Sequence, residues 1–114
     1  MVNQLSKEIQ RPIHKTEKIH CQHINTLLEN HLPKGQNIDL VDIDLEGWDE
    51  RVVKAYDWER FRPQFVAVEL KAQNVREALE HEISYHLRSK DFEMINYCHI
   101  TAFFVDKKRR RTIK

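Results

Sequence analysis

Residues 38–45 are the apolar run around which the predicted fold is built. The run carries apolar side chains at most of its positions and stops at Gly47; they are Ile38, Leu40, Val41, Ile43 and Leu45. A short run of this kind predicts a core strand. Residues 64–70 are almost continuously apolar, which is typical of an interior strand in a parallel sheet. Two core strands are therefore predicted.

Three stretches carry the signals of helices. Thr26 and Glu29 have the spacing of a capping box and introduce an apolar stripe, so a helix is predicted before the first core strand. Asp49 is expected to cap a short helix after that strand. Asn74 and Glu77 open the longest predicted helix, because apolar residues follow at helical spacing. These residues are Val75, Ala78, Leu79, Ile83 and Leu87.

The remaining segments complete the predicted organisation. Residues 92–100 and 101–105 predict two strands with so little chain between them that they must pair antiparallel. Residues 19–24 alternate weakly and predict a further strand. We therefore expect a polar leader over residues 1–18, one α/β domain over residues 19–106 and a basic tail over residues 107–114.

Acidic residues gather where the first core strand ends. Asp44 and Glu46 are expected at its carboxyl end, which is where open α/β sheets bind their ligands. There Asp44 and Glu46 are candidates for a ligand-binding or catalytic site. The alternative is structural: Asp44 and Glu46 accept N–H groups from the turn at Gly47 and cap the next helix. Glu69, at the end of the second core strand, has the same two interpretations.

Three motifs in the chain resemble a known family. They are Asp-Ile-Asp-Leu-Glu-Gly-Trp at 42–48, Asp-Trp-Glu-Arg-Phe-Arg-Pro at 57–63 and Phe-Val-Ala-Val-Glu at 65–69. Together they resemble the later half of the FkbM family of methyltransferases. In that family an acidic strand end is followed by a helix, a turn of the D-W-x-x-(F/Y)-R-P type and a strand that ends in an acid.

The resemblance implies both a fold and an activity. The fold is α/β, a Rossmann-like class I methyltransferase half-domain with sheet order 4-5-7-6 and the last strand antiparallel. The activity is methyl transfer from S-adenosylmethionine to an oxygen of a small molecule or sugar, with Asp44 and Glu46 on the acceptor side. The family's glycine-rich turn has no counterpart here, since the two glycines are Gly35 and Gly47.

We therefore expect a truncated domain that is inactive alone and does not bind S-adenosylmethionine alone. The alternative function is non-enzymatic, an interaction or remnant domain that dimerises or completes a partner.

Composition narrows the choice of partners. The formal net charge is +1 over 114 residues, so no global field favours nucleic acid, and the basic tail is interpreted as solvated. No apolar run approaches the ~18 residues of a membrane span, and no export segment is visible, so we expect a cytoplasmic protein. Cys21 and Cys98 are expected to be free, buried thiols.

The histidines do not predict a metal site. His20, Cys21 and His23 crowd together, but a strand would turn neighbours to opposite faces and no second cluster completes the ligand set. His81 and His86 are one residue too far apart for the zinc-protease helix motif, whose two histidines must share a helix face.

The strand at 38–45 has one further implication. In a complete fold its outer side would pair with another strand, and an open apolar edge promotes association. We expect this edge to be covered either by residues 19–24 folding back, or by the same strand of a second copy or a complementing chain.

Overall fold

The computed structural model describes residue 13 and residues 15–109. Within them the helices are α2 (Ile24–His31), α3 (Asp49–Ala55), α4 (Val75–Glu80) and α5 (Glu82–Ser89), and the strands are β1 (Ile38–Ile43), β2 (Pro63–Glu69), β3 (Phe92–Cys98) and β4 (Thr101–Asp106). The expected leader and tail extend beyond these residues. Residues 15–18, the last of the leader, have no regular secondary structure.

The strands form a single mixed sheet in the order β1-β2-β4-β3. β1 and β2 are parallel, with Val41 opposite Val66. β4 is antiparallel both to β2 and to β3. The protein is thus a small α/β domain with a mixed sheet, and the last strand in sequence lies between two neighbours that run the other way.

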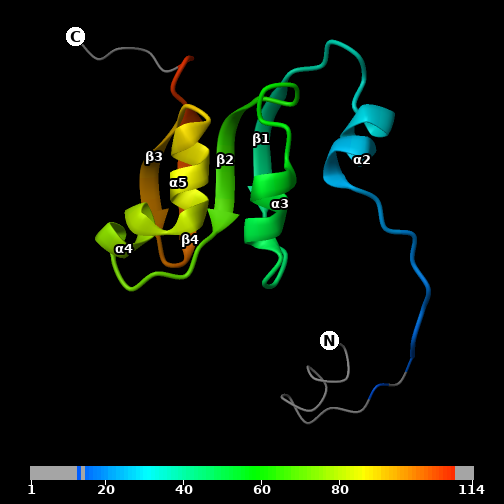
Figure 1. The fold of residues 1–114 in the computed structure, drawn as a ribbon, viewed down its shortest axis with the longest axis horizontal. Coiled ribbons are helices and arrows are strands. Elements are labelled where there is room, and N and C mark those ends of the chain that lie inside the picture. Colours follow the sequence, from blue (N-terminus) through cyan, green and yellow to red (C-terminus); the bar gives the residue numbers. More distant parts are fainter. Residues whose placement is uncertain (1–12, 14, 110–114) are drawn as a thin grey trace.

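The helices lie over one face of the sheet. α3 and α5 lie side by side across it, α4 leads into α5, and α2 packs beside α3 (Figure 1). The strand side chains that point toward these helices are buried in one core, because alternate residues of a strand face opposite ways. The largest fully buried side chains include Trp58, Phe92, Phe104, Leu70 and Leu87.

The turn between α3 and β2 is tied to this core by side-chain hydrogen bonds. The indole Nε1–H of Trp58 donates to the Val53 carbonyl at 2.8 Å, and the Tyr56 hydroxyl donates to the Phe61 carbonyl at 2.6 Å. Desolvation by burial raises the pKa of Tyr56 above its ordinary range, so the phenol remains a donor. This turn fixes where β2 enters the sheet.

Arg62 joins the same turn to the far ends of α5 and β4. Its guanidinium donates to the carbonyls of Lys90 and Asp91 and to the carboxylate of Asp106 at 2.8 Å. It also lies 4.3 Å from the centroid of the Phe92 ring. Burial alone would raise the pKa of Asp106, but the hydrogen bond from Arg62 leads the interactions that hold it below its ordinary value.

Two expectations at the start of the domain are wrong. Residues 19–23 have no regular secondary structure, so the fold-back strand is not formed and these residues do not pair with β1. The helix starts earlier than the capping-box spacing suggested, and His23, in place of Thr26, accepts the Asn25 N–H. The Asn25 side chain itself bonds to the backbone of Ala55 and Asp57, which docks α2 on the end of α3.

The longest predicted helix is also interrupted. His81 is extended, with ψ of 146°, and divides the segment into α4 and α5. Its ring Nδ1 accepts the Ile83 N–H and so caps α5. Asn74 does cap α4, as expected, by accepting the Glu77 N–H. Because of the break, Leu79 is only partly buried, whereas Ile83 and Leu87 are buried.

The two cysteines differ from the expectation in one respect. Both are free, but both are exposed. Cys21 lies in the irregular segment before α2, and Cys98 ends β3. Among the described residues, no helix is long and apolar enough to cross a membrane.

Candidate functional site

A tight turn follows β1 and determines where its acids point. The Trp48 N–H donates to the Leu45 carbonyl at 3.1 Å, which closes a four-residue turn. Its two central residues, Glu46 and Gly47, have φ of 46° and 95°. Positive φ at both positions is the signature of a type I′ turn, in which glycine is unstrained and glutamate is uncommon. The backbone of Glu46 is therefore held in a disfavoured conformation at the end of the strand.

Asp49 holds this turn in place. Its carboxylate accepts the Leu45 N–H at 2.9 Å and the Gly47 N–H at 3.3 Å. Asp49 is buried at the first position of α3, and its side chain makes no forward cap of that helix. The structural role considered for Asp44 and Glu46 at this turn thus belongs to Asp49.

The end of β2 is anchored independently. The Leu70 N–H donates to the Ile100 carbonyl at 2.7 Å. The Tyr97 hydroxyl donates to the Leu70 carbonyl and accepts the Ala72 N–H at 3.0 Å. These bonds fix the chain directly after Glu69, the last residue of β2.

Parallel pairing then brings three carboxylates together. Oxygen atoms of Asp44, Glu46 and Glu69 all lie within 4.8 Å of one another. Asp44 and Glu46 are exposed and Glu69 is partly buried. We call these three residues the acidic edge. Carboxyl ends of adjacent parallel strands meet at one side of a sheet, so the register of β1 on β2 produces this cluster.

The acidic edge favours proton sharing. A hydrogen bond with the Asp44 carboxyl is the main cause of a raised pKa of Glu69, followed by desolvation and by the negative charges of Asp44 and Glu46. Lys71 acts in the opposite direction. Like charges this close disfavour full ionisation, so one proton is held between carboxyls more readily than at an isolated glutamate.

Glu69 lies between two hollows. One, of about 190 Å³, is on the helix side and includes Asp49, Lys71 and His81 among its lining residues. The other, of about 280 Å³, opens on the opposite face of the sheet, and its lining includes Asp42, Asp44, Ala67, Thr101 and Phe103. A ligand hydroxyl in either hollow can approach the Glu69 carboxyl.

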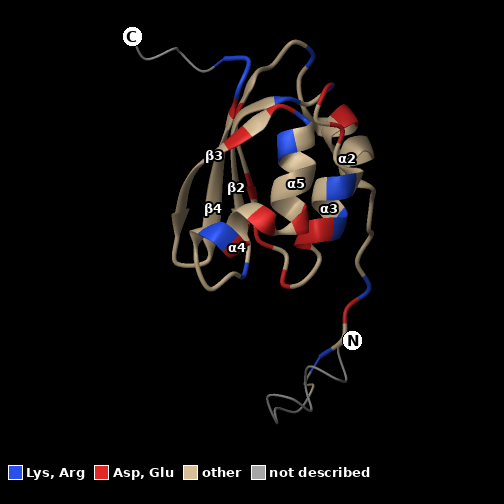
Figure 2. Ribbon diagram, turned by 60° about the vertical axis from the view of Figure 1, so that its left-hand side comes forward, with Lys and Arg blue, Asp and Glu red and all other residues tan. Residues whose placement is uncertain are grey.

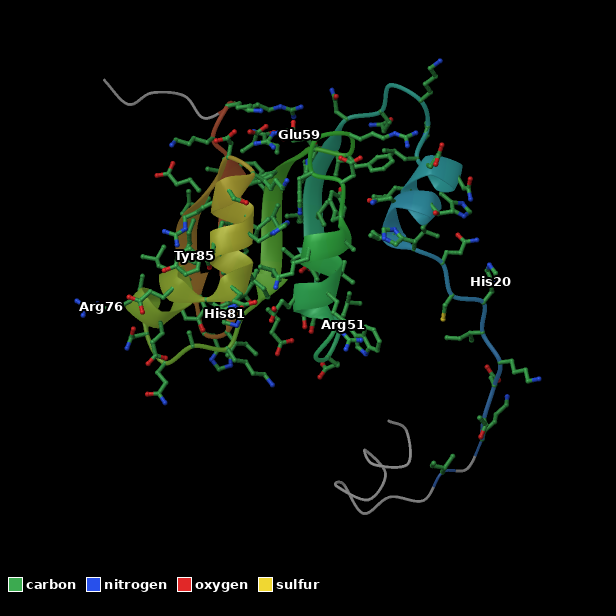
Figure 3. The ribbon with its side chains drawn as sticks, viewed as in Figure 1. His20, Arg51, Glu59, Arg76, His81 and Tyr85 are labelled. Atoms are coloured by element: carbon green, nitrogen blue, oxygen red, sulfur yellow. The ribbon has the colours of Figure 1, made fainter. Side chains whose placement is uncertain are left out.

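An arginine and a histidine also lie at this end of the molecule. Arg51 and His81 project near the ends of α3 and α5 (Figure 3). The Arg51 guanidinium stacks 4.5 Å from the Trp48 ring centroid, which keeps it beside the β1–α3 turn.

The acidic edge offers oxygen ligands only, the kind that hard cations such as Mg²⁺ and Ca²⁺ prefer. The sequence predicted no metal site, whereas in the described part of the chain these carboxylates lie close enough together to hold an ion. His20 lies on the irregular segment before α2, away from the sheet (Figure 3).

Sequence reasoning named Asp44, Glu46 and Glu69, and the structure brings all three together. It missed Tyr97 and the role of Asp49, which position the two strand ends. Asp49 was predicted to cap the next helix, and no local pattern indicates that its carboxylate bonds backward to the turn. Tyr97 carried no local signal, since its partners lie more than twenty residues away.

One comparison with known proteins gave a match. The family model of the methyltransferase FkbM domain matches residues 3–96 of the 114 residues. No curated protein and no solved structure matches the chain.

Proposed function

This chain belongs to the FkbM methyltransferase family, and we propose that it supplies the acceptor side of an O-methyl transfer to a small molecule or sugar. The observation that supports this role is the acidic edge, three carboxylates within 4.8 Å at the carboxyl ends of two adjacent parallel strands. That is the side of an α/β sheet on which ligands bind.

The acidic edge suits the proton transfer that such a reaction needs. An acceptor hydroxyl must lose its proton as its oxygen gains the methyl group, and a carboxylate within hydrogen-bond reach can accept that proton. We assign this role to Asp44, with Glu69 sharing the proton through the hydrogen bond between their carboxyls. Glu46 adds negative charge that favours proton uptake by Glu69. Asp49 and Tyr97 act as positioning residues.

The methyl donor implied by the family is S-adenosylmethionine, and the described residues do not fit it well. Close approach of a backbone to such a cofactor uses glycines in a strand-to-helix turn. Gly35 and Gly47 are both single glycines at positive φ, and space for a Cβ is open at each. They serve the conformation of their turns. We propose that a complementing polypeptide holds the donor, and that the strands β1 to β4 correspond to strands 4 to 7 of a complete Rossmann-like sheet.

A non-enzymatic role is the second candidate. The side of the sheet opposite the helices carries exposed apolar residues, which favours a domain that completes or pairs with another chain. This alternative needs no proton transfer and predicts no effect of the acidic edge on small-molecule binding.

Titration of the full chain with a panel of free sugars, followed by NMR chemical shifts, separates these functions. We expect weak, saturable shifts centred on Asp44, Gly47 and Glu69. Asp44→Asn should abolish them, whereas Asp39→Asn, which changes an exposed acid within β1, should not. Sugars that leave the acidic edge unperturbed would favour the non-enzymatic role.

Calorimetric titration with S-adenosylmethionine tests the assignment of the donor. We expect no saturable heat from this chain alone. A micromolar isotherm would show that the chain holds its own donor and would overturn the complementing polypeptide, while leaving the role of the acidic edge to the sugar titration.

A further inference from the structure

The segment predicted as one long helix is interrupted at His81, near the acidic edge. Apolar spacing continues from Val75 to Leu87 as though the helix were unbroken, yet His81 is extended and separates α4 from α5. The interruption leaves Leu79 only partly buried. Positions where the local pattern is overridden without a gain in packing are often functional. The break at His81 therefore indicates a use for this side chain beyond packing.

The imidazole of His81 has one nitrogen engaged and one without a partner. Nδ1 accepts the Ile83 N–H at 3.1 Å and so caps α5. A ring nitrogen that accepts a hydrogen bond carries no proton, so the neutral imidazole holds its proton on Nε2. Within the part of the chain that the structure describes, Nε2 makes no hydrogen bond. The cap therefore fixes Nε2–H as the donor of this ring.

His81 and Glu69 line the same hollow, the one of about 190 Å³ on the helix side of the sheet, which we call the helix-side hollow. Lys71 lines it as well, and its ammonium forms no salt bridge with any described residue. Leu70 and Ile83 add apolar surface. The volume is below the roughly 300–1,000 Å³ of sites for drug-sized ligands, so it suits a single sugar ring or one edge of it.

Other acids beside the helix-side hollow already have partners. Acidic residues open both neighbouring helices, Asp49 and Glu50 in α3 and Glu82 in α5 (Figure 2). Asp49 accepts two N–H groups of the turn after β1. Glu50 and Glu82 both bind the Lys54 ammonium at 2.9 Å. Among the described residues Glu69 forms neither a salt bridge nor a hydrogen bond with a backbone N–H, so its carboxyl can serve a ligand.

Donors distinguish the helix-side hollow from the hollow on the opposite face of the sheet. The opposite hollow is lined by the carboxylates of Asp42, Asp44 and Glu69, and no described lysine, arginine or histidine lines it. The helix-side hollow combines the Glu69 carboxyl with two donors, Lys71 and His81. A sugar hydroxyl that loses its proton needs an acceptor, whereas the oxygen beside it can accept from a donor. The helix-side hollow offers both.

We propose that the acceptor binds in the helix-side hollow as a vicinal diol, and that His81 recognises the second of its two oxygens. One hydroxyl lies against the Glu69 carboxyl, a member of the pair assigned to share its proton, and the adjacent oxygen accepts the Nε2–H of His81. These two contacts determine which of two neighbouring hydroxyls faces the carboxyl, so His81 is a specificity-determining residue. This inference rests on the proposed function, because Glu69 belongs to the acidic edge.

His81→Asn separates this contact from the cap. Asparagine is a favoured N-cap residue, and its side-chain oxygen can accept the Ile83 N–H in place of Nδ1. Its amide is shorter than the imidazole and ends before the position of Nε2, so the donor is lost. The circular dichroism and the melting temperature of the variant should therefore stay close to those of the wild type. His31→Asn, an exposed position in the last turn of α2, is the matched control.

Titration of the full chain with glucose, galactose and mannose, followed by the amide shifts of Gly47 and Glu69, tests the proposal. We expect His81→Asn to weaken binding of the best hexose roughly two- to tenfold, which corresponds to the loss of one hydrogen bond. His31→Asn should leave the affinity unchanged. Monodeoxy derivatives of that hexose identify the recognised oxygen. One derivative should bind the wild type more weakly than its parent does, and His81→Asn should remove most of this difference.

The outcomes separate this inference from the proposed function. If none of the three hexoses perturbs the acidic edge, the proposed function is overturned, and this inference with it. If a hexose perturbs the acidic edge equally in the wild type and in His81→Asn, only the assignment of His81 is overturned. Nitrogen chemical shifts of the imidazole provide a test on the wild type itself. We expect the Nε2–H tautomer and a shift of Nε2 on addition of the hexose, and an Nδ1–H tautomer would overturn the assignment.

Discussion

The two faces of this sheet are built from the same strands but differ in what their side chains contact. On the helix side, Val66, Val68 and Phe104 are almost completely buried against α3 and α5. On the face opposite the helices, the adjacent residues Phe65 and Phe103 remain more than a third exposed. Alternation along a strand assigns each residue to one of these environments, so neighbouring positions should differ sharply in their contribution to stability.

The charged groups show the same contrast. Asp106, on the helix side, is buried and paired with Arg62 and Arg109. Glu69, at the acidic edge, has two other carboxyls as its near neighbours. The pKa of Asp106 is accordingly lowered, while that of Glu69 is raised. The carboxylate of Asp106 is stabilised by cations, whereas the acidic edge gathers negative charges around Glu69.

The largest expected effect compares two adjacent phenylalanines. Phe104→Ala should lower the free energy of unfolding by about 3 to 5 kcal/mol, since it leaves a cavity in the core. Phe103→Ala should cost about 1 kcal/mol or less, because its ring is already partly hydrated. Urea denaturation of both variants measures the difference. Similar losses would mean that the face opposite the helices is packed as tightly as the core.

The next effect concerns the buried ion pair. Asp106→Ala should cost about 3 kcal/mol, because it leaves the Arg62 guanidinium buried beside Phe92 with part of its hydrogen bonding lost. Replacing both partners, as in Arg62→Met with Asp106→Leu, should recover much of that loss. Thermal melts of the single and double variants would show this. The exposed pair of Arg60 and Glu29 provides the control, and Arg60→Ala should cost at most about 1 kcal/mol.

A smaller effect distinguishes the two halves of the broken helix. Ile83→Ala should cost about 2 to 3 kcal/mol, since Ile83 lies in the core under α5. Leu79→Ala should cost about 1 kcal/mol or less, because the break at His81 leaves Leu79 partly exposed. Denaturant midpoints of the two variants provide the measurement. Equal losses would indicate one continuous helix in solution.

Much of this fold could be predicted because apolar runs report burial directly. The runs at 38–45 and 64–70 became β1 and β2, and the two late strands pair antiparallel because too few residues join them. The break at His81 could not be predicted, since apolar spacing continues from Val75 to Leu87 as though the helix were unbroken. At the break His81 is extended, its ring Nδ1 accepts the Ile83 N–H, and the Ser84 hydroxyl donates to the Ala78 carbonyl, none of which the apolar spacing indicates.

The candidate site was predictable in its residues and less so in its geometry. Asp44 and Glu46 could be named because acids at a strand end are conspicuous, and the resemblance supported them. Their distance to Glu69 depends on the register of β1 against β2, which a periodic pattern does not specify. The backward bond of Asp49 was mistaken for a helix cap for a similar reason, as either direction satisfies an acid at that position.

The smallest expected effect has the opposite sign to the others and tests the acidic edge itself. A raised pKa means that the folded protein binds a proton at Glu69 more readily than the unfolded chain does. Its contribution to stability is therefore present at low pH, below its unfolded pKa, and is lost as the pH rises through the folded pKa. At neutral pH the ionised side chain opposes folding, because it adds to the charge of Asp44 and Glu46.

Glu69→Gln should consequently raise the melting temperature slightly at pH 7, and the gain should disappear below about pH 4, where the wild-type carboxyl is protonated in both states. Asp106→Asn should do the reverse, since the lowered pKa of Asp106 stabilises the fold above its unfolded pKa and is lost on acidification. Melting temperatures of the wild type, Glu69→Gln and Asp106→Asn, measured from below pH 4 to pH 7, test both expected changes in stability. A loss of stability in Glu69→Gln at pH 7 would mean that the wild-type Glu69 carboxylate has a cationic partner. The proposal that Asp44 and Glu69 share the proton of the acceptor hydroxyl would then have to be abandoned.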